Sequence, residues 1–294
     1  MIDLSNQVAI VTGAGGGLGR AHAILLAKHG AKVVVTDLNL ETLQSVVSEI
    51  EAAGGTAMPV AGSVTEMGDV EAMVAKTLDQ WGQIDILVNN AGILRDKTFA
   101  KMDLEDFRLV MDVHLMGAVN CTKAVWDHMR ERTYGRIIMT TSSSGLFGNF
   151  GQSNYGAAKM ALVGFMNTIA LEGARYGVKV NCLAPTAATQ MVEGLLPQEE
   201  LDLLQPERVS PAVIALAGPD APTGQIICAG AGAFSAAHIT LTPGIFLGNG
   251  EDTPEQLVEN MTQVLDRDGA TVPVMGENQG RQELALAGYN RGSN

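Results

Sequence analysis

Short apolar runs rich in β-branched residues alternate with longer segments of helical periodicity along most of the chain. This alternation is typical of parallel strands joined by helical crossovers. We predict strands at 7–11, 32–36, 56–60, 84–89, 136–141, 179–183 and 225–228, and helices at 17–29, 40–53, 66–81, 103–131 and 153–176. Several strand runs lack polar alternation, as expected of strands covered on both faces. The pattern therefore predicts an α/β fold with a doubly wound, parallel, seven-stranded sheet that binds ligands at the carboxyl ends of its strands.

The pattern loosens in two places. Residues 184–210 combine Pro, Thr, Gln and Glu with scattered leucines, so we expect a loop with one short helix that covers a binding site. After Cys228 the chain becomes rich in Gly and Ala, and a helical repeat follows at 254–266. Because α/β folds of this size are commonly single domains, we expect one domain at 1–235 and a C-terminal extension at 236–294.

The composition narrows the choice of partners. The 294 residues are 46% hydrophobic and carry a formal net charge of −13, which disfavours nucleic acid and anionic membranes because both would repel the chain. Three cysteines, Cys121, Cys182 and Cys228, lack the spacing of a zinc or redox site and are expected to be buried thiols in a reducing compartment. That cysteine spacing also leads us to expect no metal. No basic leader precedes an apolar segment and no stretch reaches the length of a membrane span, so we expect a cytoplasmic protein.

A glycine-rich turn follows the first predicted strand directly. Gly13, Gly17 and Gly19 give the spacing Thr-Gly-x-x-x-Gly-x-Gly, with Leu18 between the last two glycines. Glycine at a strand-to-helix turn lets the backbone approach a pyrophosphate, and the helix N-terminus can then point its free N–H groups at the phosphates. The alternative is a glycine-rich turn without a ligand.

The second predicted strand supplies a carboxylate for the same ligand. Asp37 stands eighteen residues beyond Gly19, where it can accept hydrogen bonds from adenosine ribose hydroxyls and would repel a 2′-phosphate. Neither Leu38 nor Gly16 offers the positive charge that such a phosphate needs, so the sequence favours NAD over NADP. The alternative is a plain acid at a strand end.

Tyr155 and Lys159 stand four residues apart on one face of a predicted helix. At about 4 Å and an effective dielectric near 20, a phenolate and an ammonium attract each other by roughly 4 kcal/mol, or about three pKa units. We therefore expect the pKa of Tyr155 to fall towards neutrality, which suits a general acid or base for an alcohol and ketone pair. Surface helices also carry this spacing by chance, so its weight depends on the other motifs.

With Asn89-Asn-Ala-Gly and with Ser142 thirteen residues before Tyr155, the chain resembles the short-chain dehydrogenase/reductases over about residues 5–235. The resemblance implies a Rossmann-type fold and an NAD-dependent oxidoreductase. More narrowly, the segments that begin at Asn89, Asp112, Tyr134 and Gly148 look like the (3R)-hydroxyacyl-CoA dehydrogenase part of peroxisomal multifunctional enzyme type 2 and its bacterial relatives. This likeness implies a 3-hydroxyacyl-CoA substrate and a role in fatty acid metabolism.

The resemblance also implies a mechanism. Tyr155 takes the alcohol proton during oxidation, Ser142 orients the same oxygen, and Lys159 lowers the pKa of the tyrosine and binds the nicotinamide ribose. Hydride then passes from the carbinol carbon to C4 of NAD⁺. Ser143 and Ser144 lack the family's offset from the tyrosine, so we expect strand-end or loop hydroxyls there.

Two positions depart from the family pattern. His114 replaces an asparagine that holds a water in the proton relay; a neutral imidazole can do the same, and a hydrogen-bonded helix histidine is the alternative. Thr186 replaces the glycine of the usual Pro-Gly after the sixth strand. The resemblance implies that Pro185 and Thr186 contact the nicotinamide amide and that Thr189 contacts the pyrophosphate.

Other strand ends carry further implied cofactor contacts. These are Ser63, Val64, Asn90, Ala91 and Gly92.

The basic residues Arg95, Lys97 and Lys101 follow the fourth strand in an acidic protein. They are one candidate place for a CoA phosphate, and solvated surface is the alternative.

Three functions stay open at this point. The first is an NAD-dependent 3-hydroxyacyl-CoA dehydrogenase, and the second is a dehydrogenase of steroids or other lipophilic alcohols. Met191, Leu195 and Leu196 suit an apolar lid in either case. The third is a catalytically silent NAD-binding sensor or scaffold, which has no need of an intact serine, tyrosine and lysine. Apolar and small residues on more than one face of the predicted helices at 103–131 and 153–176 indicate a homodimer or homotetramer.

Overall fold

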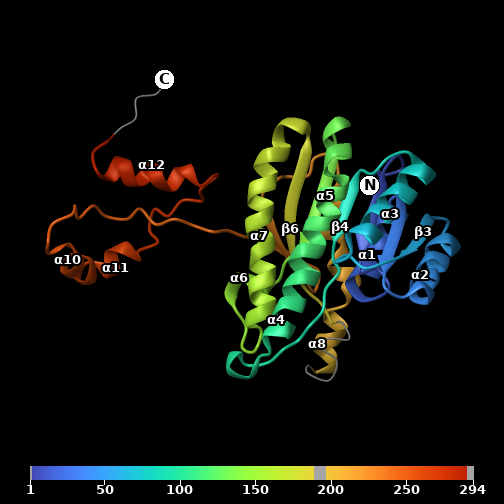
Figure 1. Cartoon of the computed structure of the whole chain (residues 1–294), viewed down its shortest axis with the longest axis horizontal. Coiled ribbons are helices and arrows are strands. Elements are labelled where there is room, and N and C mark those ends of the chain that lie inside the picture. Colours follow the sequence, from blue (N-terminus) through green and yellow to red (C-terminus); the bar gives the residue numbers. More distant parts are fainter. Residues whose placement is uncertain (1, 189–196, 290–294) are drawn as a thin grey trace. The chain divides into compact units, whose positions relative to one another are not determined.

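The structure is a computed structural model that describes residues 2–188 and 197–289. The chain forms two compact units, Met1–Ala236 and Ala237–Asn294. The first unit holds the sheet and its covering helices (Figure 1). Among the described residues, no helix has the length and apolar character needed to cross a membrane.

The sheet contains eight strands in the order β3-β2-β1-β4-β5-β6-β7-β8. They are β1 (Val8–Thr12), β2 (Lys32–Asp37), β3 (Thr56–Ala61), β4 (Ile86–Asn89), β5 (Gly135–Thr140), β6 (Val178–Thr186), β7 (Ile226–Gly230) and β8 (Ala233–Ala237). The pairings from β3 through β7 are parallel. Since the strand order reverses between β1 and β4, the carboxyl ends of these two strands frame the expected ligand crevice.

The predicted doubly wound α/β fold is confirmed, with one strand more than the seven predicted. A two-residue turn at Ala231 and Gly232, which both have positive φ, returns the chain as a hairpin and adds β8 to the edge. The Gly/Ala-rich composition of this segment masks the strand, because these residues give no hydrophobic alternation.

Helices cover both faces of the sheet. One face carries α1 (Gly17–Lys28), α2 (Leu40–Ala52) and α9 (Ser210–Ala217); the other carries α3 (Met67–Trp81), α5 (Gly117–Glu131) and α7 (Ser153–Gly173) (Figure 1). The remaining elements of this unit are η1 (Phe99–Lys101), α4 (Leu104–Met111), η2 (Asp112–Met116), α6 (Ser143–Phe147), η3 (Ala174–Tyr176), α8 (Gln198–Leu203) and η4 (Pro206–Arg208).

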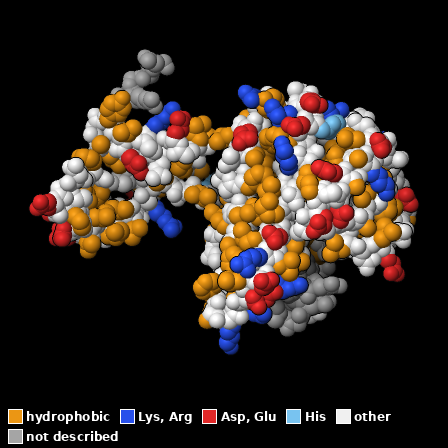
Figure 2. Space-filling view, in the orientation of Figure 1, with side chains coloured by type: hydrophobic (Ala, Val, Ile, Leu, Met, Phe, Trp, Pro, Cys, Tyr) orange, Lys and Arg blue, Asp and Glu red, His pale blue; other side chains and the backbone are white. Residues whose placement is uncertain are grey.

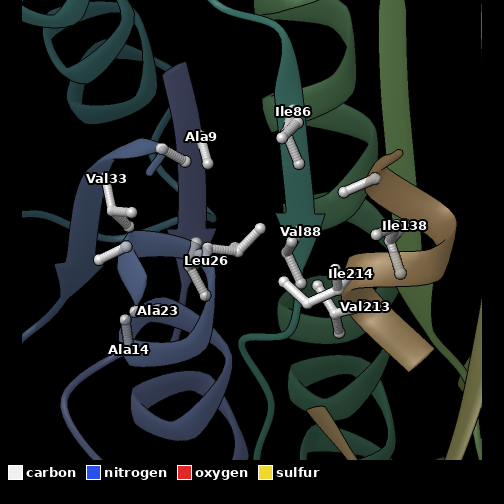
Figure 3. Packing of buried hydrophobic residues seen from close by; sticks show 14 of the residues in the cluster. Ala9, Ala14, Ala23, Leu26, Val33, Ile86, Val88, Ile138, Val213 and Ile214 are labelled. Carbon is white, nitrogen blue, oxygen red and sulfur yellow. The ribbon is translucent and has the colours of Figure 1, made fainter. Parts of the chain in front are cut away.

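The core explains why the strands show no polar alternation. On one face, Val33, Ile86 and Val88 meet Leu26 of α1 and Val213 of α9 (Figure 3). The residues that alternate with them are also buried, namely Ile10, Val34, Leu87 and Ile137. Burial of each such side chain stabilises the fold by roughly 1.5–3 kcal/mol. The packing on both faces therefore holds the strands whose ends carry the site.

Two predicted helices are interrupted. In place of one helix at 103–131, the five-residue π-helical segment η2 separates α4 from α5. Such segments occur frequently at functional sites, and η2 contains the buried His114. In the extension, the helix predicted at 254–266 is divided at Asn260 into α10 (Thr253–Glu259) and α11 (Met261–Val264), and α12 (Glu277–Leu286) was not predicted.

Candidate functional site

The glycine-rich turn between β1 and α1 packs directly against the end of β4. A Cβ atom on Gly13 would lie 2.8 Å from the Ala91 Cα atom, and one on Gly19 would lie 2.6 Å from Asn90 Nδ2. The Asn90 side chain donates from Nδ2 to the carbonyl oxygens of Thr12 at 3.0 Å and Gly13 at 3.2 Å. A Cβ atom at Gly13 or Gly19 would therefore collide with the protein's own atoms, so only glycine lets the turn pack this closely against the end of β4.

The start of α1 has the features of an anion-binding helix end. Gly17 begins the helix with a φ of 51°, Leu18 follows it half-buried, and no side chain caps the first turn. Free N–H groups at such a helix end are satisfied by a ligand or by water. The turn thus fits a pyrophosphate, as the sequence predicts.

Asp37 ends β2 beside this turn. Its Oδ2 atom accepts from the Gly15 N–H at 3.1 Å, and its Oδ1 atom accepts from the Leu38 N–H at 2.7 Å. Each carboxylate oxygen keeps a further lone pair, so Asp37 can still accept from ribose hydroxyls. At the end of β3, the Ser63 N–H donates to Asp69 Oδ2 at 2.9 Å, and the Val64 carbonyl accepts from Asn120 Nδ2 at 3.0 Å.

The structure brings Tyr155, Lys159, Ser142 and His114 together at the ends of β4 and β5. The Lys159 ammonium lies 5.5 Å from the centroid of the Tyr155 ring, and the His114 ring packs edge-on against it at 5.1 Å. Lys159 is buried and donates from Nζ to the Thr140 carbonyl at 2.5 Å. Ser142 caps the short helix α6 by accepting from the Ser144 N–H at 3.2 Å.

The electrostatics of the tyrosine and lysine pair differ from the prediction. Burial raises the pKa of Tyr155 above its ordinary value, while a hydrogen bond with Ser142 lowers it and the charge of Asp96 raises it. Burial also lowers the pKa of Lys159 to about 7. The prediction that Lys159 brings Tyr155 towards neutrality is therefore wrong for this arrangement, because it treats the ammonium as fully charged and ignores the desolvation that both groups undergo.

His114 is neutral in this environment. Burial, with a smaller contribution from Lys159, lowers the pKa of its ring to about 3. Its Nε2 atom lies 2.8 Å from the Ile93 carbonyl oxygen and 3.1 Å from the Ile93 nitrogen, so either tautomer finds a partner. Its buried Nδ1 atom has no hydrogen-bond partner among the described residues. The His114 ring also accounts for the glycine at position 92, because a Cβ atom there would collide with the ring.

A small enclosed space lies beside His114 and Lys159. Its lining includes Thr12, Val64, Asn89, His114, Gly117 and Lys159. Two buried polar atoms of this lining, Asn89 Oδ1 and His114 Nδ1, have no hydrogen-bond partner among the described residues. The space is too small to hold a water molecule in this structure. A relay role for His114 stays a prediction.

Other predicted positions have different outcomes. Pro185 and Thr186 end β6 beside β7, and Thr186 is exposed at the same edge of the sheet. Thr189 lies outside the described residues, as do Met191, Leu195 and Leu196.

The basic cluster after β4 is partly neutralised. Lys97 Nζ lies 3.0 Å from one oxygen of Asp106, and Arg95 Nε lies 3.8 Å from the other. Both cations are about half exposed to solvent, so the pairs add little stability. One carboxylate therefore offsets two cations, and the cluster offers less positive charge to a CoA phosphate than the sequence indicates.

Sequence reasoning missed the residues that hold the tyrosine in place. Asn154 is fully buried; it donates from Nδ2 to the Arg95 carbonyl at 3.0 Å and accepts from the Tyr155 N–H at 2.8 Å. Thr141 donates from Oγ1 to the Lys159 carbonyl at 2.6 Å. No periodic pattern marks these residues, and adjacency to Tyr155 is the one signal that points to Asn154.

Comparison with known proteins places these features in a family. The family model described as short chain dehydrogenase matches residues 7–200. The chain is 43% identical over 282 residues to peroxisomal multifunctional enzyme A of Dictyostelium discoideum, which covers 92% of this chain and 63% of that protein. It is 44% identical over 225 residues to a 3-oxoacyl-[acyl-carrier-protein] reductase of Synechocystis, which covers 74% of this chain and 91% of that protein.

Solved structures give the same result. Full-length peroxisomal multifunctional enzyme type 2 from Drosophila melanogaster matches with a TM-score of 0.83 and 39% identity over 98% of this chain and 50% of that chain. A 7α-hydroxysteroid dehydrogenase complexed with NADH and 7-oxo glycochenodeoxycholic acid matches with a TM-score of 0.73 and 30% identity over 79% of this chain and 95% of that chain. The chain thus spans 63% of the Dictyostelium relative and half of the Drosophila one. The predicted likeness to multifunctional enzyme type 2 is confirmed.

Proposed function

The chain belongs to the short-chain dehydrogenase/reductase family of oxidoreductases that act on CH–OH donors, and from this membership we propose that it interconverts a 3-hydroxyacyl-CoA and a 3-ketoacyl-CoA with NAD. The observation that carries the chemistry is the convergence of Tyr155, Ser142 and Lys159 at the sheet edge beside the glycine turn. The relative named as a peroxisomal multifunctional enzyme supports this substrate class, and the relative named as a 3-oxoacyl-[acyl-carrier-protein] reductase supports the 3-oxoacyl group but on a different carrier.

The residues fit a nicotinamide dinucleotide. Gly13 and Gly19 leave no room for a Cβ atom because the turn packs against Asn90 and Ala91. This tight turn leads into the uncapped start of α1, which suits the pyrophosphate. The Asp37 carboxylate stands beside the same turn and suits the adenosine ribose. When bound, NAD supplies the hydride acceptor for alcohol oxidation.

The protein's own residues manage the proton. The raised pKa of Tyr155 keeps the phenol protonated at neutral pH, which suits proton donation to a ketone oxygen during reduction. Ser142 lowers the pKa of the same tyrosine by hydrogen bonding, which supports a role in orienting the substrate oxygen. Lys159, with a pKa of about 7, can hold or release a proton near neutral pH, so it suits the exchange of protons with the tyrosine in both directions.

The preference for NAD over NADP is part of the proposal. Asp37 stands where a 2′-phosphate would meet a negative charge, and Leu38 beside it is 75% exposed and uncharged. A phosphate there would lack a cationic partner from these two residues. Kinetics with both cofactors test this preference.

A second substrate class is supported by one observation. The 7α-hydroxysteroid dehydrogenase covers 79% of this chain with the same fold. A steroid or another lipophilic secondary alcohol therefore stays the alternative substrate class. A silent NAD-binding sensor stays the third candidate function.

We propose assembly through α7 and the neighbouring helix surface. Hydrophobic side chains gather over α7 and the adjacent part of α5 in Figure 2. On α7, Met160 is 37% and Leu171 is 46% exposed, and the exposed Ala157 and Gly164 allow close helix approach. Light scattering on the purified chain would show a dimer or tetramer if this face pairs, and a monomer would contradict it.

Cytoplasmic location also stays a proposal, because two of the relatives carry the word peroxisomal in their names. Microscopy of the tagged chain in its own cells, with the tag at either end, tests it.

The proposed reaction is tested by following NADH absorbance with a panel of 3-hydroxyacyl-CoA esters and a panel of hydroxysteroids. Turnover of the CoA esters supports the proposal, and turnover of steroids alone favours the second class. If the protein binds NADH but turns over neither panel, and Tyr155→Phe behaves like the wild type, the result favours the NAD-binding sensor over both enzymes. The matched control is Tyr289→Phe, which removes an exposed phenol from the other compact unit.

A further inference from the structure

Two loops at the catalytic edge are joined by side chains that the proposed mechanism does not use. One loop follows β4 and contains Asp96; the other leads into α7 through Gln152, the residue that precedes the first turn of that helix. Gln152 donates from Nε2 to Asp96 Oδ2 at 2.6 Å. The backbone strengthens this contact, because the Lys97 N–H donates to the Gly151 carbonyl at 2.9 Å. The Asp96 carboxylate is thereby attached to the segment that leads into Tyr155.

Gln152 passes this contact on to the serine segment. Its Oε1 atom accepts from Ser144 Oγ at 2.8 Å and from Asn149 Nδ2 at 3.0 Å. The Ser144 N–H in turn donates to Ser142 Oγ at 3.2 Å. Hydrogen bonds through Gln152 and Ser144 therefore link Asp96 to the Ser142 hydroxyl, the group that lowers the pKa of Tyr155.

The chemistry of the carboxylate decides how the Gln152 amide is turned. An ionised carboxylate only accepts hydrogen bonds, whereas an amide has a donor end and an acceptor end. Asp96 must therefore take the NH₂ end, which leaves Oε1 for the Ser144 hydroxyl. An uncharged amide at position 96 imposes no such choice, since it can donate as well as accept.

We propose that Asp96 is a positioning residue for the alcohol and ketone reaction: by orienting the Gln152 amide, it holds the segment that carries Ser142 in register with Tyr155. The inference rests on the proposed function. Asp96 acts through Gln152 and does not itself have to touch the substrate.

The same carboxylate acts on Tyr155 through space, which provides a readout that a purely structural contact would lack. The negative charge of Asp96 contributes to the raised pKa of Tyr155. The other groups that face the phenol are Ser142, Lys159 and His114. The cations nearest Asp96 in sequence, on the same loop, are paired with Asp106. Removal of the Asp96 charge is therefore expected to move the titration of Tyr155 to lower pH.

The kinetic test compares Asp96→Ala, Asp96→Asn and Gln152→Ala with the wild type. Misplacement of a reacting group by about 1 Å can cost on the order of 100-fold in rate, so we expect kcat to fall roughly 10- to 100-fold in Asp96→Ala with a smaller change in KM. Asp96→Asn keeps the size and one acceptor, and its kcat is expected to lie between the two. Because Asp96 and Gln152 act as one unit, the double variant should be no slower than the slower single variant.

The matched control is Asp79→Asn, which removes the same charge from an exposed site on α3. It should leave both kcat and the pH profile of oxidation unchanged. In Asp96→Asn the rising limb of that profile should move to lower pH, because the tyrosine must be deprotonated to accept the alcohol proton.

A measurement without substrate separates this inference from the proposed function. The chain has only four tyrosines, so ¹³C-labelled tyrosine gives four phenol signals, and the signal lost in Tyr155→Phe is assigned to Tyr155. Its titration midpoint should fall in Asp96→Asn and stay unchanged in Asp79→Asn. If the wild type turns over no substrate, the proposed function is contradicted. The titration of Tyr155 needs no substrate, so it still tests the role of Asp96. A Tyr155 midpoint that is identical in the wild type and Asp96→Asn, or a wild-type kcat in Asp96→Ala, would overturn the positioning role.

Discussion

Replacement of Lys159 by methionine should inactivate the protein and stabilise its fold at neutral pH. Lys159 is buried, and burial lowers its pKa from the ordinary value of 10.5 to about 7. The unfolded chain therefore binds more protons than the native chain between these two values, and wild-type stability rises with pH across that window. Methionine fills a similar volume and carries no charge to desolvate.

The size of the effect follows from the same two values. The pKa difference between 10.5 and about 7 corresponds to roughly 4 kcal/mol of destabilisation at pH 7, which falls to less than about 1 kcal/mol at pH 10. Against this gain, the variant leaves the Thr140 carbonyl without the Nζ donor, at a cost of about 1–3 kcal/mol. We expect Lys159→Met to be more stable than the wild type by about 1–3 kcal/mol at pH 7. Near pH 10 the advantage should vanish or reverse.

Urea unfolding of the cofactor-free protein checks this prediction. The two tryptophans, Trp81 and Trp126, lie in α3 and α5, so their fluorescence reports on the first unit without the extension. The free energy of unfolding is measured for both proteins between pH 7 and pH 10. The reasoning fails if Lys159→Met is the less stable protein at pH 7, or if the difference between the two proteins does not change with pH.

Three further predictions concern the site. Gly92→Ala should destabilise the fold by about 1–3 kcal/mol because its Cβ atom would collide with His114. The loss of stability should be smaller when Gly92→Ala is made in a His114→Asn background. Urea unfolding of the wild type, both single variants and the double variant measures this coupling, and an equal loss in both backgrounds would contradict the contact. Tyr155→Phe should lower kcat by at least about 100-fold, since it removes the proton donor, while NADH fluorescence titration should show unchanged binding; a kcat close to that of the wild type would refute its role. Asp37→Ser should raise kcat/KM with NADP relative to NAD, because the charge that would repel a 2′-phosphate is removed; an unchanged cofactor ratio would count against Asp37 as the source of discrimination.

The sequence by itself determined the fold class, because strands buried on both faces and helices between them leave a pattern that depends only on local periodicity. The glycine turn could be predicted for a similar reason, since Gly13, Gly17 and Gly19 lie close together along the chain and serve one local bend. The spacing of Ser142, Tyr155 and Lys159 also pointed to one site through family resemblance. The eighth strand and the breaks at η2 and Asn260 escaped prediction, because single residues and short turns decide them.

Only the tertiary structure decided the electrostatics and the supports of the site. Burial changes the pKa of Lys159 and Tyr155 in directions that a pairwise estimate from sequence spacing does not contain, because desolvation depends on what packs around each group. The bonds from Asp96 to Gln152 and from Asn154 to the Arg95 carbonyl join segments that are more than fifty residues apart in the sequence. Periodicity describes how a segment faces its surroundings, whereas contacts between distant loops exist only once the sheet has placed their strands side by side.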